Sequence, residues 1–413
     1  MTAVVVYSTI SGTSQFRPLR KTAKEQIGAL LRRTADQARW RLRGDFSMNF
    51  YVWQRFENTN RGDIAIRETI GAQVAALALP TPCDLVEVQW GQLTESHVQR
   101  LNEAGGIFVL AGGGYLFLDG DGSISPRIEA DIALMRRMSC LRVGYGIGIN
   151  QVRVGSNLSP VTAEDLPQAT HETLRRFAAT VDLISVRDRS SKNVLDAVIG
   201  GGMPQVHLIG DPVLFLNPGP PPHRPPPQQG MLLGLNFALH GRNTAATLPE
   251  RMLWIVPFLR RMRASWNCRF RYFVHSDTEH VLVHLLRRAG FQMEVIDGDT
   301  ATLMRGYAEL DAHVCQMMHS SIMAISAWVP TLNIGYDVKN REFFSLLGID
   351  GCCIDQAEAN EDLLFERTAT LLADTAGFVE TVARNRQALQ RNLSAFQSEI
   401  LARAGAARVA SEA

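Results

Sequence analysis

Short apolar runs alternate with amphipathic stretches along most of this 413-residue chain. Apolar runs rich in β-branched and aromatic residues predict buried strands, and apolar positions at three- and four-residue steps predict helices. In the first half, strands are predicted at residues 48–56, 84–90, 107–111, 141–149, 182–186 and 206–209. Helices are predicted there at residues 64–79 and 94–104, with a further one through Leu195 and Val198.

The second half repeats this alternation. Strands are predicted at residues 231–237, 270–274, 293–296 and 331–335, and helices at residues 249–263, 279–289 and 301–309. Residues 363–396 contain few helix breakers and predict a largely helical segment. Apolar strands that end in glycine or charged residues are typical of parallel sheets covered on both faces, with ligands at the carboxyl ends of the strands.

A proline-rich segment divides the two halves. Residues 217–230 read NPGPPPHRPPPQQG, and half of them are proline, which excludes a helix or a central strand. We therefore predict an N-terminal Rossmann-like domain at residues 46–216, an interdomain linker at residues 217–230, and a C-terminal Rossmann-like domain at residues 231–375. The predicted fold is α/β, with two doubly wound Rossmann-like domains in a GT-B-like arrangement and a cleft between them.

Two further segments flank these domains. Residues 1–45 are predicted to be a basic N-terminal helical extension, and residues 376–413 a C-terminal helix with a tail that frays after Gly405. Residues 17–43 carry nine basic and two acidic residues, a local charge of +7 in a chain of net charge +1. Two interpretations stand: a solvated helix that packs one apolar stripe on the domain, or peripheral contact with an anionic membrane surface. Nucleic-acid binding is not expected, because basic and aromatic residues interleave nowhere else.

Composition indicates an ordinary globular protein with room for two cores, at 46% hydrophobic and 20% charged residues. No apolar run reaches the roughly 18 residues that a membrane-spanning helix needs. The N-terminus lacks the basic segment and the long apolar run of a secretory signal. The sequence therefore predicts a cytoplasmic protein.

The six cysteines are scattered and form neither a CxxC pair nor a Cys/His spacing suited to zinc. No metal site is therefore predicted. Cys315 lies close to His319 in the sequence, which allows the hypothesis of a nucleophile. A cysteine in an apolar stretch is more often a small core residue, which is the simpler interpretation.

The stretch from Asp311 to Lys339 carries the clearest candidate site. His319, Ser320 and Ser321 open an apolar, helix-like run that Pro330 stops. At a helix start, free backbone N–H groups and the helix dipole favour a bound anion. Tyr336, Asp337 and Lys339 follow the next predicted strand and would lie at the same edge of the sheet.

Polar and glycine residues also follow strands of the first half. Asn60 and Asp63 lie in a predicted strand-to-helix loop, where Asp63 could simply be the helix cap. Gly112, Gly113 and Gly114 follow a buried strand and would let backbone N–H groups approach a ligand. This triplet matches neither the dinucleotide fingerprint nor a P-loop.

The order of several blocks resembles a known family. NTNRGD, LAGGGYL, GYGIG, ISVRDRSS with a later GDP, and HSSIMAISAWVPTLNIGYDVKN follow one another between about residues 48 and 350. Together they resemble the polysaccharide pyruvyl transferase family. The resemblance implies a GT-B-like enzyme that transfers the enolpyruvyl group of phosphoenolpyruvate to a sugar, usually as a pyruvate ketal across two hydroxyls of a cell-surface polysaccharide precursor.

The resemblance also implies the partners. Phosphoenolpyruvate is the donor substrate, no cofactor is expected, and the acceptor is a saccharide. A lipid-linked acceptor would give the basic segment at residues 17–43 a purpose at the inner face of the membrane. The reaction needs cationic or N–H donors for a phosphate and a carboxylate, an acid for the methylene carbon, and a base for the hydroxyl.

Two parts of the resemblance carry the proposed chemistry. His319 matches the histidine of the family's Arg-x-His motif, which implies phosphate contact or proton transfer. Arg187 matches the arginine of the family's Arg-Asp pair and would clamp an anion, while Asp188 would orient it or act as a base. A purely structural Arg-Asp pair is the competing interpretation.

The remaining candidates are assigned to binding or to the acceptor. Ser320 and Ser321 would donate to the phosphate, and Asp63 would meet the acceptor hydroxyl. Lys339 matches a lysine after the family's Tyr-Asp pair, with a surface role as the alternative. Asn60 would join these binding residues, and so would the backbone at Gly113 and Gly114.

One departure from the family pattern bears on activity. Met317 stands where the family has an arginine, and it cannot donate to a phosphate. Arg305, Arg242 and His240 are possible substitutes for that charge. Two alternatives therefore stay open beside the pyruvyl transferase: a GT-B glycosyltransferase that uses a nucleotide sugar, and a non-catalytic family member that acts as a scaffold in polysaccharide assembly.

Overall fold

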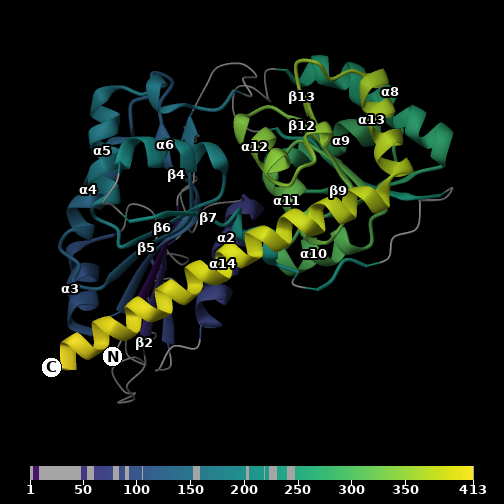
Figure 1. The fold of residues 1–413 in the computed structure, drawn as a ribbon. Coiled ribbons are helices and arrows are strands. Elements are labelled where there is room, and N and C mark those ends of the chain that lie inside the picture. Colours follow the sequence, from purple (N-terminus) through teal and green to yellow (C-terminus); the bar gives the residue numbers. More distant parts are fainter. Residues whose placement is uncertain are drawn as a thin grey trace, which may run out of the picture.

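The computed structural model describes residues 3–8, 48–53, 60–77, 83–88, 93–104, 106–151, 159–200, 204–217, 219–222, 230–239 and 247–412. The chain forms two parallel β-sheets, each flanked by helices (Figure 1). The predicted α/β class with Rossmann-like domains is thereby confirmed.

The first sheet contains seven strands in the order β1-β3-β2-β4-β5-β6-β7. Its strands are β1 (Ala3–Ser8), β2 (Met48–Trp53), β3 (Cys83–Glu87), β4 (Gly106–Leu118), β5 (Leu141–Gln151), β6 (Leu183–Val186) and β7 (Val206–Leu208). Strand β1 pairs in parallel with β3 and β4. Residues 3–8 are therefore part of this sheet and not of a separate helical extension, which corrects the prediction for residues 1–45.

Helices cover both faces of the first sheet. They are α2 (Arg61–Ala75), α3 (Glu95–Ala104), α4 (Pro126–Met135), α5 (Gln168–Ala178) and α6 (Arg189–Ile199). Alternate residues of β4 pack to opposite sides: Val109 joins the core under α2, whereas Phe108 and Leu110 join the core under α3 to α6. This period of two is what a strand buried on both faces requires.

The second sheet contains six strands in the order β10-β9-β8-β11-β12-β13. They are β8 (Leu232–Asn236), β9 (Arg269–Phe273), β10 (Met293–Ile296), β11 (Ala312–Cys315), β12 (Thr331–Gly335) and β13 (Cys353–Asp355). Its helices are α8 (Leu248–Trp266), α9 (His280–Arg288), α10 (Thr300–Ala308), α11 (Met318–Ser326), α12 (Val338–Leu346) and α13 (Glu361–Ala373). The central strand β11 was not predicted from the sequence.

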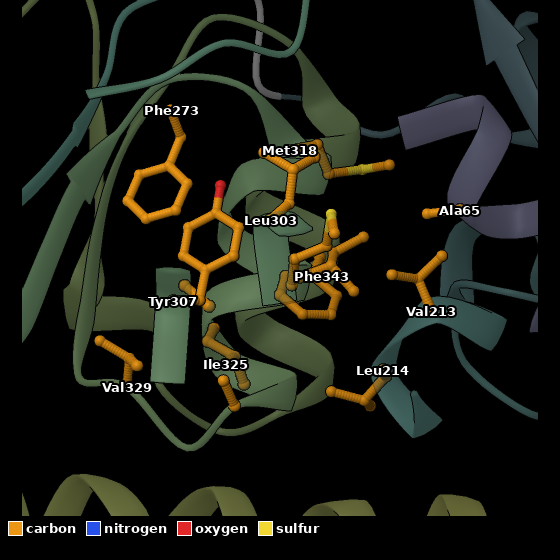
Figure 2. Packing of buried hydrophobic residues seen from close by; sticks show 14 of the residues in the cluster. Ala65, Val213, Leu214, Phe273, Leu303, Tyr307, Met318, Ile325, Val329 and Phe343 are labelled. Atoms are coloured by element: carbon orange, nitrogen blue, oxygen red, sulfur yellow. The ribbon is translucent and has the colours of Figure 1, made fainter. Parts of the chain in front are cut away.

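The core under α2 continues into the second half of the chain. Ala65 of α2 and Val213 and Leu214 of the short helix η2 (Pro212–Phe215) face Met318 and neighbouring apolar residues of the second half (Figure 2). These apolar side chains are buried and belong to one cluster with residues of both halves, so the two halves share one continuous hydrophobic core. Burial of this kind favours a fixed relation between them.

The last helix contacts both halves of the chain. Helix α14 (Thr375–Glu412) runs across both sheets, as the yellow helix in Figure 1 shows. Arg386 donates to the carbonyl of Ser326 in α11, and Arg403 donates to the carbonyl of Asp182 at the start of β6. The helix continues to Glu412, past Gly405, where the sequence predicted fraying.

The triple glycine lies inside a strand, which corrects the prediction of a loop. Gly112, Gly113 and Gly114 belong to β4, beside the glycine-rich strand β5. A Cβ on Gly112 would lie 2.8 Å from the carbonyl oxygen of Gly146, and a Cβ on Gly114 would lie 2.7 Å from the side chain of Asn150. Close strand packing therefore explains the absence of side chains here.

Two predicted segments fall largely outside the described residues. These are the basic segment at residues 17–43 and, for residues 218 and 223–229, the proline-rich linker, which connects η2 to β8. Among the described helices, none is both long enough and apolar enough to cross a membrane.

Candidate functional site

His319 lies in the first turn of α11, directly after the carboxyl end of β11. The residue at the N-cap position is Met317, which has no side-chain oxygen to accept from the helix N–H groups. The N–H of Met317 donates instead to Oδ1 of Asn236, at the end of β8, at 3.1 Å. The predicted placement of His319 at a helix start is what the structure shows.

The imidazole of His319 packs on the first turn of α2. A Cβ added to Gly62 would lie 2.2 Å from Nδ1 of His319, so only glycine fits at position 62. Asn60 is the N-cap of α2, and its Oδ1 accepts from the N–H of Gly62 at 3.0 Å. Asp63 lies in the first turn of the helix and is not its cap, which corrects the prediction of a loop at these residues.

Asp211 faces His319 from the first half of the chain. Its Oδ2 lies 3.7 Å from Nε2 of His319, which makes the contact an ion pair when the histidine is protonated but leaves it too long for a hydrogen bond. Asp211 is 2% exposed, and Oδ2 has no hydrogen-bond partner among the described residues. Burial alone would raise the pKa of Asp211, yet His319, Arg187 and the N–H of Val213 hold that pKa below its usual value.

Arg187 and Asp188 follow the end of β6 on the same side. Nε of Arg187 lies 3.3 Å from Oδ2 of Asp188, and both residues are 6% exposed. Asp188 is also the N-cap of α6, because its Oδ1 accepts from the N–H of Ser191 at 2.7 Å. Asp188 therefore has a structural role as a cap, whereas Arg187 is the cation whose charge reaches Asp211.

Ser320 and Ser321 point into the core of the second half. Both are 0% exposed. Oγ of Ser320 contacts Tyr307 at 2.7 Å and His313 at 2.8 Å, and Oγ of Ser321 accepts from Nδ2 of Asn333 at 2.9 Å. Hydroxyls held this way do not face a ligand, which corrects the expectation that they donate to a phosphate.

Met317 lies in a small apolar cluster with Ala238 and Tyr336. The hydroxyl of Tyr336 is 3.7 Å from Sδ of Met317. Arg251 of α8, which is 1% exposed, reaches Oε1 of Gln316 beside this cluster. Burial lowers the pKa of Arg251 to about 10, so the guanidinium is still charged at neutral pH. The structure thus places a buried cation in contact with Gln316, the residue that precedes Met317 in the sequence.

Of the proposed substitutes for the missing arginine, the structure describes Arg305 alone. Arg305 donates to Thr302 within α10, at 3.0 Å. Arg242 and His240 lie outside the described residues. Lys339 pairs with Asp337 at 3.3 Å in the first turn of α12, and both side chains are about one-fifth exposed. Lys339 therefore lies at the edge of the second sheet, as predicted, but in an ion pair of its own.

Three polar contacts join the two halves of the chain. Arg61 pairs with Asp277 at 3.3 Å and with Asp297 at 2.9 Å. Glu342 of α12 accepts from the N–H of Ser190 in α6 at 3.1 Å. Arg61 and its partners are partly exposed, so these pairs fix the geometry more than they stabilise the fold, with less than about 1 kcal/mol each.

Sequence reasoning missed Asp211, Asn236 and Glu279. Asp211 follows β7 and entered only through the GDP block. Asn236 is the last residue of β8, and Glu279 is the last residue of the short helix η3 (Asp277–Glu279), which follows β9. Nδ2 of Asn236 donates to Oε2 of Glu279 at 2.9 Å, and burial raises the pKa of Glu279 to about 8. Their position after parallel strands was the available signal, but no motif marks them.

The cysteine hypothesis finds no support. Cys315 is 0% exposed, and burial raises the pKa of its thiol to about 12, so it is not the thiolate that nucleophilic catalysis needs. Among the described residues, no group of three or more His, Cys, Asp or Glu residues is placed to hold a metal ion.

Comparison with known proteins adds the following findings. A family model described as polysaccharide pyruvyl transferase matches residues 32–338. A search of the curated proteins gives no match. A proposed UDP-N-acetylglucosamine 2-epimerase from Listeria monocytogenes is similar in structure, with a TM-score of 0.49 and 15% identity over 85% of this chain and 96% of that chain.

A UGT transferase from Siraitia grosvenorii, solved in complex with UDP, is similar to the same degree. Its TM-score is 0.49 and its identity 12%, over 86% of this chain and 99% of that chain. Likenesses this distant carry no information about the reaction or the ligands of this chain.

Proposed function

This chain belongs to the polysaccharide pyruvyl transferase family, and from that premise we propose that it transfers the pyruvyl group of phosphoenolpyruvate to a saccharide as a pyruvate ketal. Membership makes it a transferase of polysaccharide biosynthesis with a saccharide acceptor. The donor and the ketal product are our proposal.

One observation carries the proposal: His319 at the start of α11, packed on the start of α2 and 3.7 Å from the buried Asp211. Two helix N-termini meet at this imidazole, and their N–H groups and dipoles favour an anion. The carboxylate of Asp211 faces the ring from the other half of the chain. The group therefore combines an anion site with a candidate proton donor, which are two of the requirements of phosphoenolpyruvate chemistry.

The reaction can be written with these groups. A proton adds to the methylene carbon of phosphoenolpyruvate while the first saccharide hydroxyl adds to C2 and gives its proton to a base. The bond between C2 and the phosphate oxygen breaks, and phosphate leaves with the electron pair. The second hydroxyl adds to C2, closes the ketal and releases its proton.

The roles follow from position. His319 donates the proton or binds the phosphate, and Arg187 supplies positive charge at the carboxyl end of β6. Asp63, next to Gly62 in the first turn of α2, is the proposed base for the acceptor hydroxyl. Asp188 caps α6, so we propose that it orients Arg187 and does not transfer a proton.

No cofactor and no metal are required by this scheme, since phosphoenolpyruvate is already activated. We further propose that the reaction is cytoplasmic. A lipid-linked acceptor, approached through residues 17–43 at the inner face of the membrane, is the form of substrate that the charge of that segment favours.

The test is a transfer assay with phosphoenolpyruvate labelled with ¹³C at C2 and a lipid-linked oligosaccharide fraction as acceptor. We expect the ¹³C resonance of a ketal carbon to appear with the native protein and to be lost with His319→Ala. Ser326→Ala is the matched control, because it removes a buried hydroxyl at the other end of the same helix.

Other outcomes separate the alternatives. Transfer from a nucleotide sugar without use of phosphoenolpyruvate would replace the proposal by a glycosyltransferase. Binding of the oligosaccharide without turnover of either donor would favour a scaffold, the alternative that Met317 keeps open.

A further inference from the structure

Trp328 has an unusual backbone conformation at the end of α11. Its φ is 63°, in the left-handed region that favours glycine. It directly follows Ala327, the C-cap of the helix. The N–H of Val329 donates to the carbonyl of Ala324 at 2.9 Å, which is the Schellman ending, where glycine usually occupies the position of Trp328. A bulky side chain there costs free energy that glycine would avoid, so the contacts of the tryptophan side chain must offset that cost.

The indole of Trp328 contacts the segment of the chain that leaves the first half. Its Nε1 donates at 3.2 Å to the carbonyl of Gly219, in the linker that connects η2 to β8. The guanidinium carbon of Arg386, on α14, lies over the indole ring, 4.5 Å from its centroid. A cation at this distance from an aromatic face is attracted to it. Trp328 therefore joins the end of α11 to the linker and to α14.

Arg386 is a buried cation that binds carbonyl oxygens and aromatic rings. It is 6% exposed, and it donates to the carbonyl of Ser326 at 3.3 Å and to the carbonyl of Asn217. The ring centroid of Phe215 lies 5.9 Å from the guanidinium carbon. Ser326 is the last residue of α11, and the free carbonyls at a helix end form the negative pole of the helix dipole, which favours a cation. Arg386 thus connects the end of α11 to the residues that follow η2.

Residues 211–217 run beside α11 and link the contacts at the end of this helix to those at its start. Val213 and Leu214 of η2 face Met318 and its apolar neighbours in the second half (Figure 2). Apolar contacts are not directional, so they alone do not fix how far the segment is shifted along the helix. The register of the segment must therefore come from polar contacts.

Polar contacts hold this segment to α11 at both of its ends. At one end, the carboxylate of Asp211 lies 3.7 Å from Nε2 of His319, at the start of the helix. At the other end, the N–H of Asn217 donates to Oγ of Ser326 at 3.2 Å, and Arg386 bridges the carbonyls of these two residues. A shift of the segment at Asn217 would therefore also change the distance between Asp211 and His319.

We propose that Trp328 and Arg386 form a clamp that fixes residues 211–217 in register with α11. The clamp thereby positions Asp211 against His319. Both clamp residues act through Asp211, so they are positioning residues and not catalytic ones. The importance of the clamp for catalysis rests on the function proposed above, whereas its hold on residues 211–217 does not.

Hydrogen–deuterium exchange of the full-length protein tests this hold. Arg386→Met keeps the length of the side chain and removes its charge and donors. We expect the amides of residues 211–217 to exchange at least about tenfold faster in this variant, the effect of losing a hydrogen bond to a charged group. Arg403→Met is the matched control and should leave this exchange unchanged, because Arg403 also donates from α14 to a backbone carbonyl, that of Asp182. Ser326→Ala keeps both carbonyls that Arg386 binds and should retain the clamp.

Two substitutions of Trp328 separate its backbone cost from its side chain. Trp328→Gly relieves the strain at this position but removes the contacts with Gly219 and Arg386. We therefore expect faster exchange of residues 211–217 in this variant, although its backbone conformation is the less strained one. Trp328→Phe keeps a ring beneath the guanidinium and should stay closer to the native protein. Native exchange in Trp328→Gly would exclude the tryptophan from the clamp.

Kinetics test whether the clamp acts through Asp211. Arg386→Met should lower kcat for pyruvyl transfer by about 10- to 100-fold, because a misplacement of about 1 Å can cost about 100-fold. In an Asp211→Asn background, the contact that the clamp positions is already lost, so the same substitution should change kcat by less than about twofold. A purely structural role would lower kcat equally in both backgrounds.

The proposal is overturned if residues 211–217 exchange equally fast in Arg386→Met and Arg403→Met. It is also overturned if Arg386→Met costs as much kcat in the Asp211→Asn background as in the native one. Absence of pyruvyl transfer by the native protein would refute the proposed function alone, because the exchange comparison needs no donor. If Arg386→Met does not fold, Arg386→Lys permits the same comparison with a smaller expected increase in exchange, since lysine keeps the cation and lacks the fork that bridges two carbonyls.

Discussion

Helices α6 and α11 begin in the same way in the two halves, directly after a strand at the carboxyl edge of a parallel sheet. They differ in the cap. Asp188 caps α6 with its own carboxylate, which also pairs with Arg187, whereas Met317 at the start of α11 has no side-chain cap. The third residue of each helix, Ser191 and Ser320, is buried.

The difference shows what each helix start is available for. At α6, the carboxylate already satisfies the N–H groups and complements the dipole, so little is left for an anion. At α11, the N–H of Met317 donates to the side chain of Asn236, which in turn donates to Glu279, and His319 occupies the first turn. The second helix start is therefore the one suited to an anionic ligand.

The largest expected effect comes from His319→Ala. Loss of an acid–base group lowers the rate by about 10² to 10⁴, measured as kcat for pyruvyl transfer. Ser190→Ala changes the matching position of α6 and should stay within about twofold, as a change away from the chemistry does. Equal losses in both variants would break the distinction between the two helix starts.

Glu279→Gln tests the contact between Glu279 and Asn236, the residue that binds the backbone at the start of α11. Burial raises the pKa of Glu279 to about 8 from a usual value of 4.5, so the folded protein holds a proton that the unfolded chain releases between these values. Stability must therefore fall as pH rises through this window, by up to about 1.4 kcal/mol per pH unit.

The glutamine keeps the neutral form, so its unfolding free energy, measured by urea denaturation from pH 5 to 8, should lack this slope. Asp277→Asn, at an exposed carboxylate nearby, is the control and should keep it. A slope that is unchanged in Glu279→Gln would contradict the assigned contact.

Met317→Arg sharpens the comparison by adding a cation where α11 lacks a cap. A charge-assisted contact adds about 1.5 to 3 kcal/mol, which corresponds to phosphoenolpyruvate binding about 10- to 100-fold tighter by calorimetry. Met317→Leu keeps the size and adds no charge, so its dissociation constant should match that of the native protein. Weaker binding by the arginine variant would place the phosphate elsewhere.

The smallest expected effect concerns the contact between α2 and α11. Gly62→Ala should destabilise the protein by about 1 to 3 kcal/mol through overpacking, because the new methyl overlaps His319. In a His319→Ala background the overlap is gone, and the same change should stabilise the helix by up to about 1 kcal/mol. Denaturant unfolding of the four proteins measures this reversal of sign, and destabilisation in both backgrounds would argue against the contact.

The sequence predicted the alternation of strands and helices well, because strands of parallel sheets are continuous apolar runs that pattern alone reveals. It missed β11, whose four residues include the polar His313. It placed the glycines of β4 in a loop, since nothing local shows that β5 packs against them. Tertiary packing decided both cases.

For the site, the helix-start pattern located His319 and the strand end located Arg187. The contact of His319 with Asp211 joins residues more than a hundred positions apart. The orientation of Ser320 depends on a side chain of another helix, that of Tyr307. No local pattern could predict either of them.

The most direct test of the account is calorimetric titration of phosphoenolpyruvate into the native protein, His319→Ala and Ser190→Ala. We predict binding to the native protein, an unchanged dissociation constant for Ser190→Ala, and at least about tenfold weaker binding for His319→Ala, the 1.4 kcal/mol expected from one lost contact to a charged group. Equal binding by all three proteins, or no binding to the native protein, would contradict the assignment of the start of α11 as the donor site.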